Sequence, residues 1–151
     1  MAAQTAAGTV ISIGSTGDLS TETSWTTIGE VVSISEFGRT YAEVTHNPLT
    51  DRGTEKFKGS YNDGDITLQL AQDLSDAGQQ ALLDALDDDA AFNFQVLQND
   101  APDTGEPTTH VFKARVMSFT HNVDGVDSIV GASVTLGIVS GTLDTTAATA
   151  A

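Results

Sequence analysis

The chain has 151 residues, the length of one ordinary domain. Its 21 acidic residues against six Lys and Arg give a formal net charge of −15. Proteins that bind nucleic acid neutralise its phosphates with Lys and Arg. The excess of acidic over basic residues therefore argues against a nucleic-acid-binding function and against binding to an anionic membrane. The absence of cysteine excludes disulfides, thiolate metal sites and cysteine nucleophiles.

Residues 1–8 and 142–151 are small, low in complexity and without apolar periodicity. We expect them to be a flexible N-terminal arm and a flexible C-terminal tail around a single domain over residues 9–141. Residues 1–8 lack the basic and apolar regions of a signal peptide, and no run approaches 18 apolar residues. The sequence therefore predicts neither a leader nor a membrane span.

Most apolar residues of the domain recur with period two or gather in β-branched clusters, which is typical of strands. The strongest pattern is a pair of runs separated by Asp124-Gly125, a dipeptide that favours a tight hairpin turn because both residues tolerate positive φ. In the second run, Val126 and Ile138 belong to the same apolar face. The predicted strands cover residues 9–13, 30–34, 41–44, 65–70, 91–97, 110–119 and 126–138.

One segment has helical spacing, with Leu82, Ala85 and Leu86 on one face, and predicts an α-helix over about residues 75–88 that begins at Ser75 as its N-cap. The acidic residues Asp87, Asp88 and Asp89 crowd its C-terminus, where the helix dipole makes each unfavourable by about 0.3–1 kcal/mol. They form either a solvated turn or a patch that meets a partner's basic group.

The stretch between residues 44 and 66 is polar and contains several turn-forming positions. It holds Arg52, Lys56 and Lys58, half of the chain's basic residues, and Arg39 lies just before it. Loops of this length in a compact domain are usually functional or disordered. We therefore predict an inter-subunit contact loop that includes these four residues and Phe57.

Motifs of catalysis and cofactor binding are missing: the sequence has no G-x-S-x-G, G-x-x-x-x-G-K, G-x-G-x-x-G or H-E-x-x-H. His46, His110 and His121 have no metal-ligand spacing. The run from Tyr61 to Asp65 lacks the twelve-residue calcium-loop pattern. We expect no catalytic residue, no metal site and no cofactor, and an enzyme is the least favoured class.

The helix segment Asp76-Ala-Gly-Gln-Gln-Ala-Leu-Leu83, followed by Phe92-Asn-Phe94 and the run from Val111 to Phe119, resembles the major tail tube proteins of lambda-like long-tailed bacteriophages. The segment from Ser24-Trp25 to Val31 and the final run from Ala132 to Ile138 also match that family, in the same order. The resemblance covers roughly residues 9–141.

This resemblance implies a mainly β domain, an antiparallel β-sandwich or barrel-like structure with one flanking helix. It implies a structural virion protein whose copies form hexameric rings that stack into a hollow tail tube, a conduit for genome delivery. Its partners would be itself and the tape measure, tail terminator and tail tip proteins, and double-stranded DNA would pass through without specific binding. Its location would be the phage tail, after assembly in the host cytoplasm.

Two hypotheses about sites follow. Arg52, Lys56 and Lys58 would meet carboxylates of neighbouring subunits, with Asp87–Asp89 as candidates. Asp65 and Asp127, which alternate with the apolar residues of their predicted strands, would line the lumen and repel DNA phosphates, or else face outer solvent.

Two other functions stay open. Inner-tube proteins of contractile tails and of type VI-like secretion machines share this fold, and the sequence separates them poorly from phage tail tubes. A monomeric β-sandwich module that binds carbohydrate or protein belongs to another class. Such modules generally present aromatic platforms, whereas aromatic residues are 6% of this chain and Trp25 is its single tryptophan.

Overall fold

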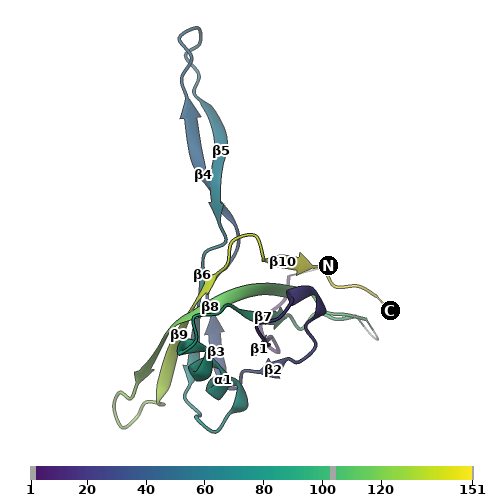
Figure 1. Cartoon of the computed structure of the whole chain (residues 1–151), viewed down its shortest axis with the longest axis vertical. Coiled ribbons are helices and arrows are strands. Elements are labelled where there is room, and N and C mark those ends of the chain that lie inside the picture. The colour runs from purple at the N-terminus through teal and green to yellow at the C-terminus, as the bar shows by residue number, and fades with distance from the viewer. Residues whose placement is uncertain (1–2, 103–104, 151) are drawn as a thin grey trace.

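The computed structural model describes residues 3–102 and 105–150. Within these ranges it is mainly β, with one α-helix and one short 3-10 turn (Figure 1). The elements are β1 (Val10–Ile13), η1 (Leu19–Thr21), β2 (Thr26–Thr27), β3 (Val31–Ile34), β4 (Thr40–His46), β5 (Glu55–Asn62), β6 (Asp65–Ala71), α1 (Ala77–Leu86), β7 (Phe92–Leu97), β8 (Thr109–Asn122), β9 (Gly131–Ile138) and β10 (Asp144–Thr146).

The main sheet has the strand order β2-β1-β7-β8-β9-β6-β3, and every pair in it is antiparallel. Its two outermost strands, β2 and β3, are consecutive in the chain and joined by residues 28–30. The Ile28 N–H donates to the Ile11 carbonyl over 2.9 Å, and the Ala71 N–H donates to the Glu30 carbonyl over 2.8 Å. This short segment therefore closes the curled sheet, and the expected barrel-like antiparallel domain with one helix is confirmed.

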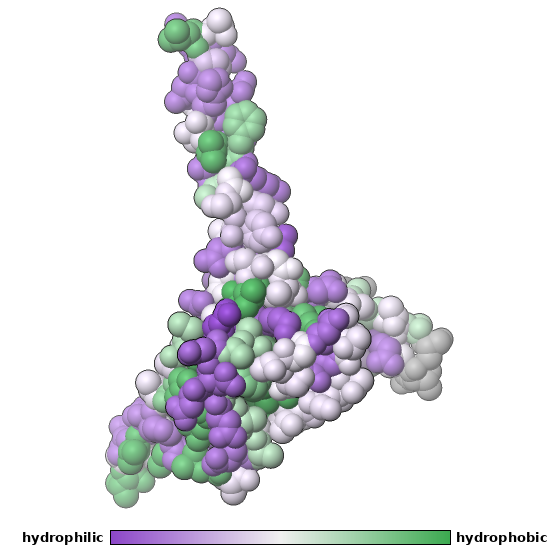
Figure 2. All heavy atoms as spheres, in the orientation of Figure 1, coloured by the Kyte–Doolittle hydropathy of each residue, from purple (hydrophilic) through white to green (hydrophobic). Residues whose placement is uncertain are grey.

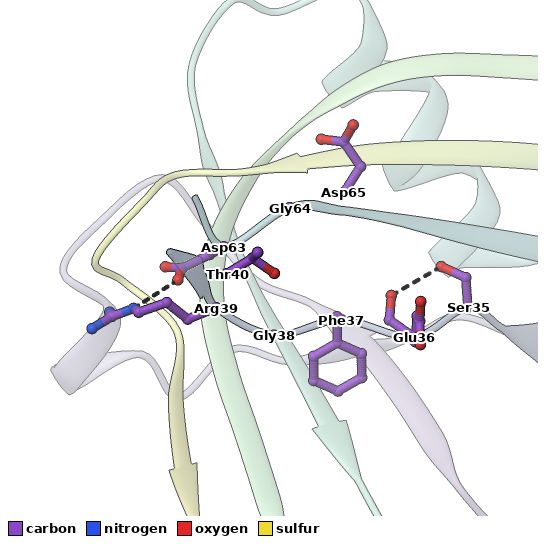
Figure 3. A pocket seen from close by; sticks show the side chains of 9 residues that line it. All are labelled: Ser35, Glu36, Phe37, Gly38, Arg39, Thr40, Asp63, Gly64 and Asp65. Carbon is purple, nitrogen blue, oxygen red and sulfur yellow. Dashed lines mark hydrogen bonds and ion pairs between the residues drawn. The ribbon is translucent and has the colours of Figure 1, made fainter. Parts of the chain in front are cut away.

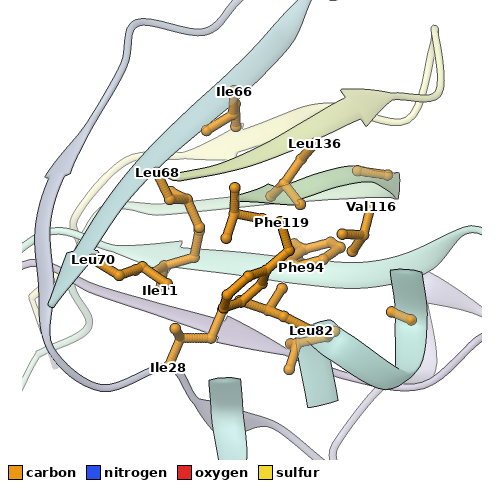
Figure 4. Close-up of a cluster of buried hydrophobic side chains, with 14 of the residues drawn as sticks. Ile11, Ile28, Ile66, Leu68, Leu70, Leu82, Phe94, Val116, Phe119 and Leu136 are labelled. Atoms are coloured by element: carbon orange, nitrogen blue, oxygen red, sulfur yellow. The ribbon is translucent and has the colours of Figure 1, made fainter. Parts of the chain in front are cut away.

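The core lies inside this curled sheet because its strands alternate buried and open residues. In β6, Ile66, Leu68 and Leu70 are buried while the residues between them face outward. The rings of Phe94 and Phe112 stack at 5.7 Å between centroids. Figure 4 shows Phe94 among the other buried side chains of this cluster. Removing these side chains from water is the main stabilising contribution, at about 25 cal/mol per Å² of apolar surface.

Helix α1 covers the core with Leu82 and Ala85, and polar groups hold it against the closing segment. Its N-cap is Asp76 and not Ser75, because the Asp76 carboxylate accepts hydrogen bonds from the N–H groups of Gln79 and Gly29, each at 3.0 Å. That carboxylate thus caps the helix and binds the closing segment at once.

Gln79 is fully buried and makes three hydrogen bonds to backbone groups. Its Nε2 donates to the carbonyls of Gly29 (3.1 Å) and Ala71 (3.0 Å), and its Oε1 accepts from the Asp73 N–H (3.0 Å). Gly78 lets the helix approach this closely, since a Cβ there would lie 2.5 Å from the Ile28 Cα. The helix segment of residues 76–83, which resembles the tail tube family, thus helps to close the barrel.

The hairpin of β8 and β9 is present, but the tight turn predicted at Asp124-Gly125 is wrong. An eight-residue connection, residues 123–130, joins the strands, and β9 begins only at Gly131. Asp124 does take a positive φ of 55°, yet Val126 is 99% exposed instead of lying in the core. The alternation before Gly131 therefore belongs to an exposed loop.

The flexible tail expected over residues 142–151 is partly strand. β10 pairs with β8, with Thr145 opposite His110, and a further bridge joins Glu106 to Thr149. Backbone pairing to a sheet edge needs no apolar periodicity, so the sequence pattern did not reveal it. Within the described ranges, no helix has the length and apolarity needed to cross a membrane.

Candidate assembly interface

Strands β4 and β5 form a separate two-stranded hairpin, residues 40–62, which we call the arm; it projects away from the barrel (Figure 1). Every residue of β4 is exposed, as is every residue of β5 except the half-buried Gly59. The predicted contact loop is therefore a strand, a turn and a second strand. A hairpin without a buried face leaves a weak pattern in the sequence, which is why only residues 41–44 were predicted as a strand.

The two faces of the arm differ in chemistry. On one face the Lys56 Nζ lies 3.4 Å from a carboxylate oxygen of Glu43, and the Lys58 Nζ lies 4.8 Å above the ring centroid of Tyr41. On the other, Val44 stands directly opposite Phe57 in the register, and these two side chains are 49% and 53% exposed. Figure 2 shows apolar residues on the arm among mostly polar ones. Val44 and Phe57 thus form an exposed apolar pair on this face of the arm, which we call its apolar face.

The arm is also electrically distinct from the rest of the chain. Its positive residues are balanced by an equal number of carboxylates, so its formal charge is zero and residues outside it carry the whole −15. The basic loop expected from the sequence is therefore a neutral arm on an acidic body. The charged residues of the arm are Glu43, Asp51, Arg52, Glu55, Lys56 and Lys58.

The base of the arm is anchored by an ion pair between an exposed arginine and a buried aspartate (Figure 3). The Arg39 Nε donates to a carboxylate oxygen of Asp63 over 3.0 Å, and the other oxygen accepts from the Gly141 N–H over 2.7 Å. Asp63 is fully buried, which raises its pKa, but the hydrogen bonds from Gly141 and Arg39 outweigh burial and hold the pKa below its usual value. The Arg39 guanidinium also lies 4.2 Å from the ring centroid of Tyr61. Arg39 is thus engaged inside its own chain.

Glycines flank this ion pair where the chain enters and leaves the arm. Gly64 takes a φ of 82° and Gly38 a φ of 153°, conformations that L side chains rarely adopt. Both line an open hollow of about 540 Å³ at the arm's base, together with Phe37 and Asp65. The backbone at the arm's base therefore adopts conformations that favour glycine, next to the Arg39–Asp63 pair.

The acidic residues at the end of α1 lie apart from the arm within one chain (Figure 1). Asp87 is the C-cap residue, and the Asp88 carboxylate accepts from the Ala90 N–H over 3.0 Å. The Asp89 carbonyl accepts from the Arg115 Nε over 2.9 Å. All three aspartates are exposed, so they remain accessible to a second copy, and the structure of one chain does not bring them to Lys56 or Lys58.

The two residues proposed for the lumen occupy different settings. Asp65 is exposed at the start of β6, on the open face that also carries Gln69, whose Nε2 donates to the Ser133 hydroxyl over 3.3 Å. Asp127 lies in the β8–β9 loop and not on a strand, so its predicted alternation with core residues is wrong. Of the two aspartates, Asp65 lies on the polar open face of the sheet and Asp127 does not.

Sequence reasoning missed Val44, the apolar residue opposite Phe57, and Asp63, the buried anchor. The pairing of Val44 with Phe57 could have been suspected from their symmetric distance to the turn residues Pro48 and Gly53. Asp63 gave no signal, because its partner Gly141 is distant in sequence and contributes only a backbone N–H.

No cluster of three metal-ligating His, Asp or Glu side chains occurs among the described residues. The ring nitrogens of His110 lie 2.9 Å from the Thr145 hydroxyl and 3.0 Å from the Gln98 side-chain oxygen, and burial lowers the pKa of His110. His121 contacts the Gln72 side-chain oxygen at 2.6 Å. Each of these two histidines therefore contacts polar side chains from other segments of the same chain.

No known family model matches the sequence, and no curated protein matches it significantly. Solved structures do match its fold. The SPP1 tail tube matches with a TM-score of 0.68 at 18% identity, covering 92% of this chain and 77% of the other. A chain from the tail of an empty gene transfer agent particle, determined with C6 symmetry, matches with a TM-score of 0.69 at 17% identity, covering 96% and 100%.

The fold is that of tail tube proteins. A third match extends it to contractile machines: a chain of the sheath–tube complex of the extracellular contractile injection system PVC has a TM-score of 0.67 at 17% identity, covering 92% of this chain and 88% of the other. The tail tube fold thus accounts for the barrel and α1 together, in agreement with the sequence resemblance.

Proposed function

We propose that this chain is a structural virion protein that assembles into stacked hexameric rings and forms the hollow tube of a phage tail. The observation that carries the proposal is the match of nearly the whole chain to tail structures, one of them determined with C6 symmetry. The resemblance of residues 76–83, 92–94 and 111–119 to major tail tube proteins points to the same assembly.

The surface of the isolated chain suits a polymer. Strands β4 and β5 pair only with each other among the described residues, so the outer edge of each is free. Exposed edges invite pairing with another chain, and a ring of subunits removes them. A head-to-tail contact that does not close on itself continues into a filament, which is what stacking of rings requires.

The charge suits a conduit for DNA. Six copies at −15 each would give a ring a formal charge of −90. Carboxylates in the lumen would repel phosphates, so double-stranded DNA would slide without specific binding. We propose Asp65, on the open face of the sheet, as a lumen residue; Asp127 is an exposed loop residue and a weaker candidate.

We propose that the arm contacts neighbouring subunits through Arg52, Lys56, Phe57 and Lys58, while Arg39 fixes its direction. All four contact residues are exposed, and the arm is the neutral part of an otherwise acidic chain. The pairing of its basic residues with Asp87–Asp89 of another copy stays a prediction. It is supported by the exposure of the three aspartates.

In this account residues 9–141 form the tube domain, and residues 1–8 and 142–151 are its terminal extensions. The protein would be made in the host cytoplasm and act in the virion tail, with the tape measure, terminator and tip proteins as partners. Its role would be structural and not catalytic, without a cofactor.

A second candidate is the inner tube of a contractile tail or of a related injection machine. The match to the PVC sheath–tube complex supports it. The two candidates share the tube and differ in whether an outer sheath surrounds it.

Purified protein examined by negative-stain electron microscopy tests the proposal. We expect hollow tubes or six-fold rings from the wild-type chain. A variant in which residues 45–56 are replaced by a short Asn-Gly turn should stay folded by circular dichroism and form no long tubes. Persistent monomer from the wild-type chain at high concentration would contradict the proposal and favour a monomeric binding module.

A further inference from the structure

Two exposed apolar features lie at opposite ends of the molecule's longest axis (Figure 1). At one end is the arm, with Val44 and Phe57 on its apolar face and Leu49 fully exposed near its tip. At the other is the β8–β9 loop, residues 123–130, where Val126 is 99% and Ile129 is 81% exposed. Apolar side chains gathered on a loop without a covering element are typical of an interaction surface.

On the polar face of the arm, Lys56 and Lys58 already contact Glu43 and Tyr41 of the same chain. On the apolar face, Val44 and Phe57 remain about half exposed to solvent. Docking of the arm is therefore governed by Val44, Leu49 and Phe57 more than by its lysines. Burying such side chains is favourable by about 25 cal/mol per Å² of apolar surface, whereas exposed ion pairs contribute little.

The arm's Arg52 and the aspartates of the β8–β9 loop also carry charges of opposite sign. Arg52, near the arm's tip, forms no ion pair within the part of the chain that the structure describes. The β8–β9 loop carries Asp124 and Asp127 and no basic residue. An acidic loop and a tip with a free guanidinium attract each other, while most other surfaces of two copies at −15 each repel.

Geometry selects a second copy of this chain as the partner. The arm and the β8–β9 loop are different surfaces at opposite ends, so a contact between them is heterologous and repeats along one direction. Copies stacked along the long axis bring the arm of one to the loop of the next. Such a contact buries an apolar patch at both ends of every copy.

We propose that the apolar face of the arm docks onto the β8–β9 loop of a copy in the next ring, with Phe57 and Val44 against Val126 and Ile129. Arg52 then faces Asp124 or Asp127. This inference rests on the proposed tube function and names the contact that joins one ring to the next.

Cysteine cross-linking tests the contact cleanly, because the natural chain has no cysteine. The double variant F57C/I129C is assembled and treated with a short bis-maleimide. We expect a ladder of covalent oligomers on denaturing gels, since each copy links to two others. The variant F57C/D88C places the second thiol on the acidic patch beside α1, which is the alternative acceptor for the arm, and docking on the β8–β9 loop predicts no ladder from it.

The outcomes separate the two proposals. Tubes with a ladder from F57C/D88C and none from F57C/I129C would overturn the docking inference and leave the tube intact. Failure of the wild-type chain to form tubes or rings would overturn both.

A second variant tests the same contact without cross-linking. V126D/I129D should melt like the wild type, because both side chains are exposed in the single chain. Its critical concentration for tube formation should rise at least about tenfold. An unchanged critical concentration would contradict the inference.

Discussion

The substitution Gln79→Leu tests whether the buried amide holds α1 to the segment that closes the barrel. Leu has nearly the same size, so the change removes hydrogen bonds without opening a large cavity. Three backbone groups lose their partner: the carbonyls of Gly29 and Ala71 and the N–H of Asp73. Each buried group left unsatisfied costs about 1–3 kcal/mol.

The total is limited by two effects that the structure shows. Gly29, Ala71 and Asp73 are half-buried, so water can replace part of what is lost. The Leu side chain also gains about 1 kcal/mol by leaving water. We therefore expect the free energy of unfolding to fall by about 2–4 kcal/mol, which at a typical m-value moves the urea midpoint by roughly 1–2 M.

The assay is urea unfolding followed by circular dichroism, at a concentration where size-exclusion chromatography shows monomer. The matched control is Gln80→Leu, the exposed neighbour on the same helix, which should change stability by no more than about 0.5 kcal/mol. A Gln79→Leu variant as stable as this control would refute the role assigned to the amide.

Four further predictions concern the closing segment, acid stability, the arm's anchor and the arm's charges. Gly78→Ala should destabilise the chain by about 1–3 kcal/mol in urea unfolding despite the better helix propensity of alanine, because the new Cβ would collide with the Thr27 carbonyl; a stabilised variant would contradict the close approach. Hydrogen bonds from Ser15 lower the pKa of Glu22 from 4.5 to about 2, so the contribution of Glu22 to stability is present above pH 4.5 and is lost as the pH falls toward 2. The free energy of unfolding of Glu22→Gln should therefore fall less steeply across that pH range than that of the wild type. An equally steep fall in the variant would argue against this role of Glu22. Asp63→Asn should lower the melting temperature and release the arm, seen as faster proteolysis at the arm's base, whereas Asp65→Asn should do neither. Charge reversal at both Lys56 and Lys58 should slow tube assembly if these residues meet Asp87–Asp89, and unchanged tube length and rate would count against that pairing.

Strands that pack against the core were predictable from the sequence because burial imposes alternation. Ile66, Leu68 and Leu70 alternate with polar residues and predicted β6 within one residue of its observed end. The helix was predictable from Leu82 and Ala85, although capping placed its start at Asp76, since Asp76 and Ser75 are both good caps and only the contact with Gly29 favours one of them.

The arm and the β8–β9 loop were described wrongly for the same physical reason. Neither packs on the core, so burial does not link their sequence pattern to their structure. Val126 continued the alternation of a buried strand and proved to be exposed, while Phe57 lay in a polar stretch and proved to be in a strand. Sequence patterns report what one chain buries, and the apolar residues of these segments are exposed in the single chain.

Anchoring of the arm could not be predicted either. Asp63 binds the backbone N–H of Gly141, a group that every residue but proline carries, so no side-chain pattern marks the contact. Its other partner, Arg39, was noticed for its charge but was expected to serve a neighbouring subunit.

Electron cryomicroscopy of assembled wild-type protein tests the central claim most directly. The account predicts a hollow helical tube with six copies per ring, a lumen lined by the open face that carries Asp65, and an arm of each copy in contact with the adjacent ring. Monomers or closed dimers under all assembly conditions, or a filament without a lumen, would contradict it.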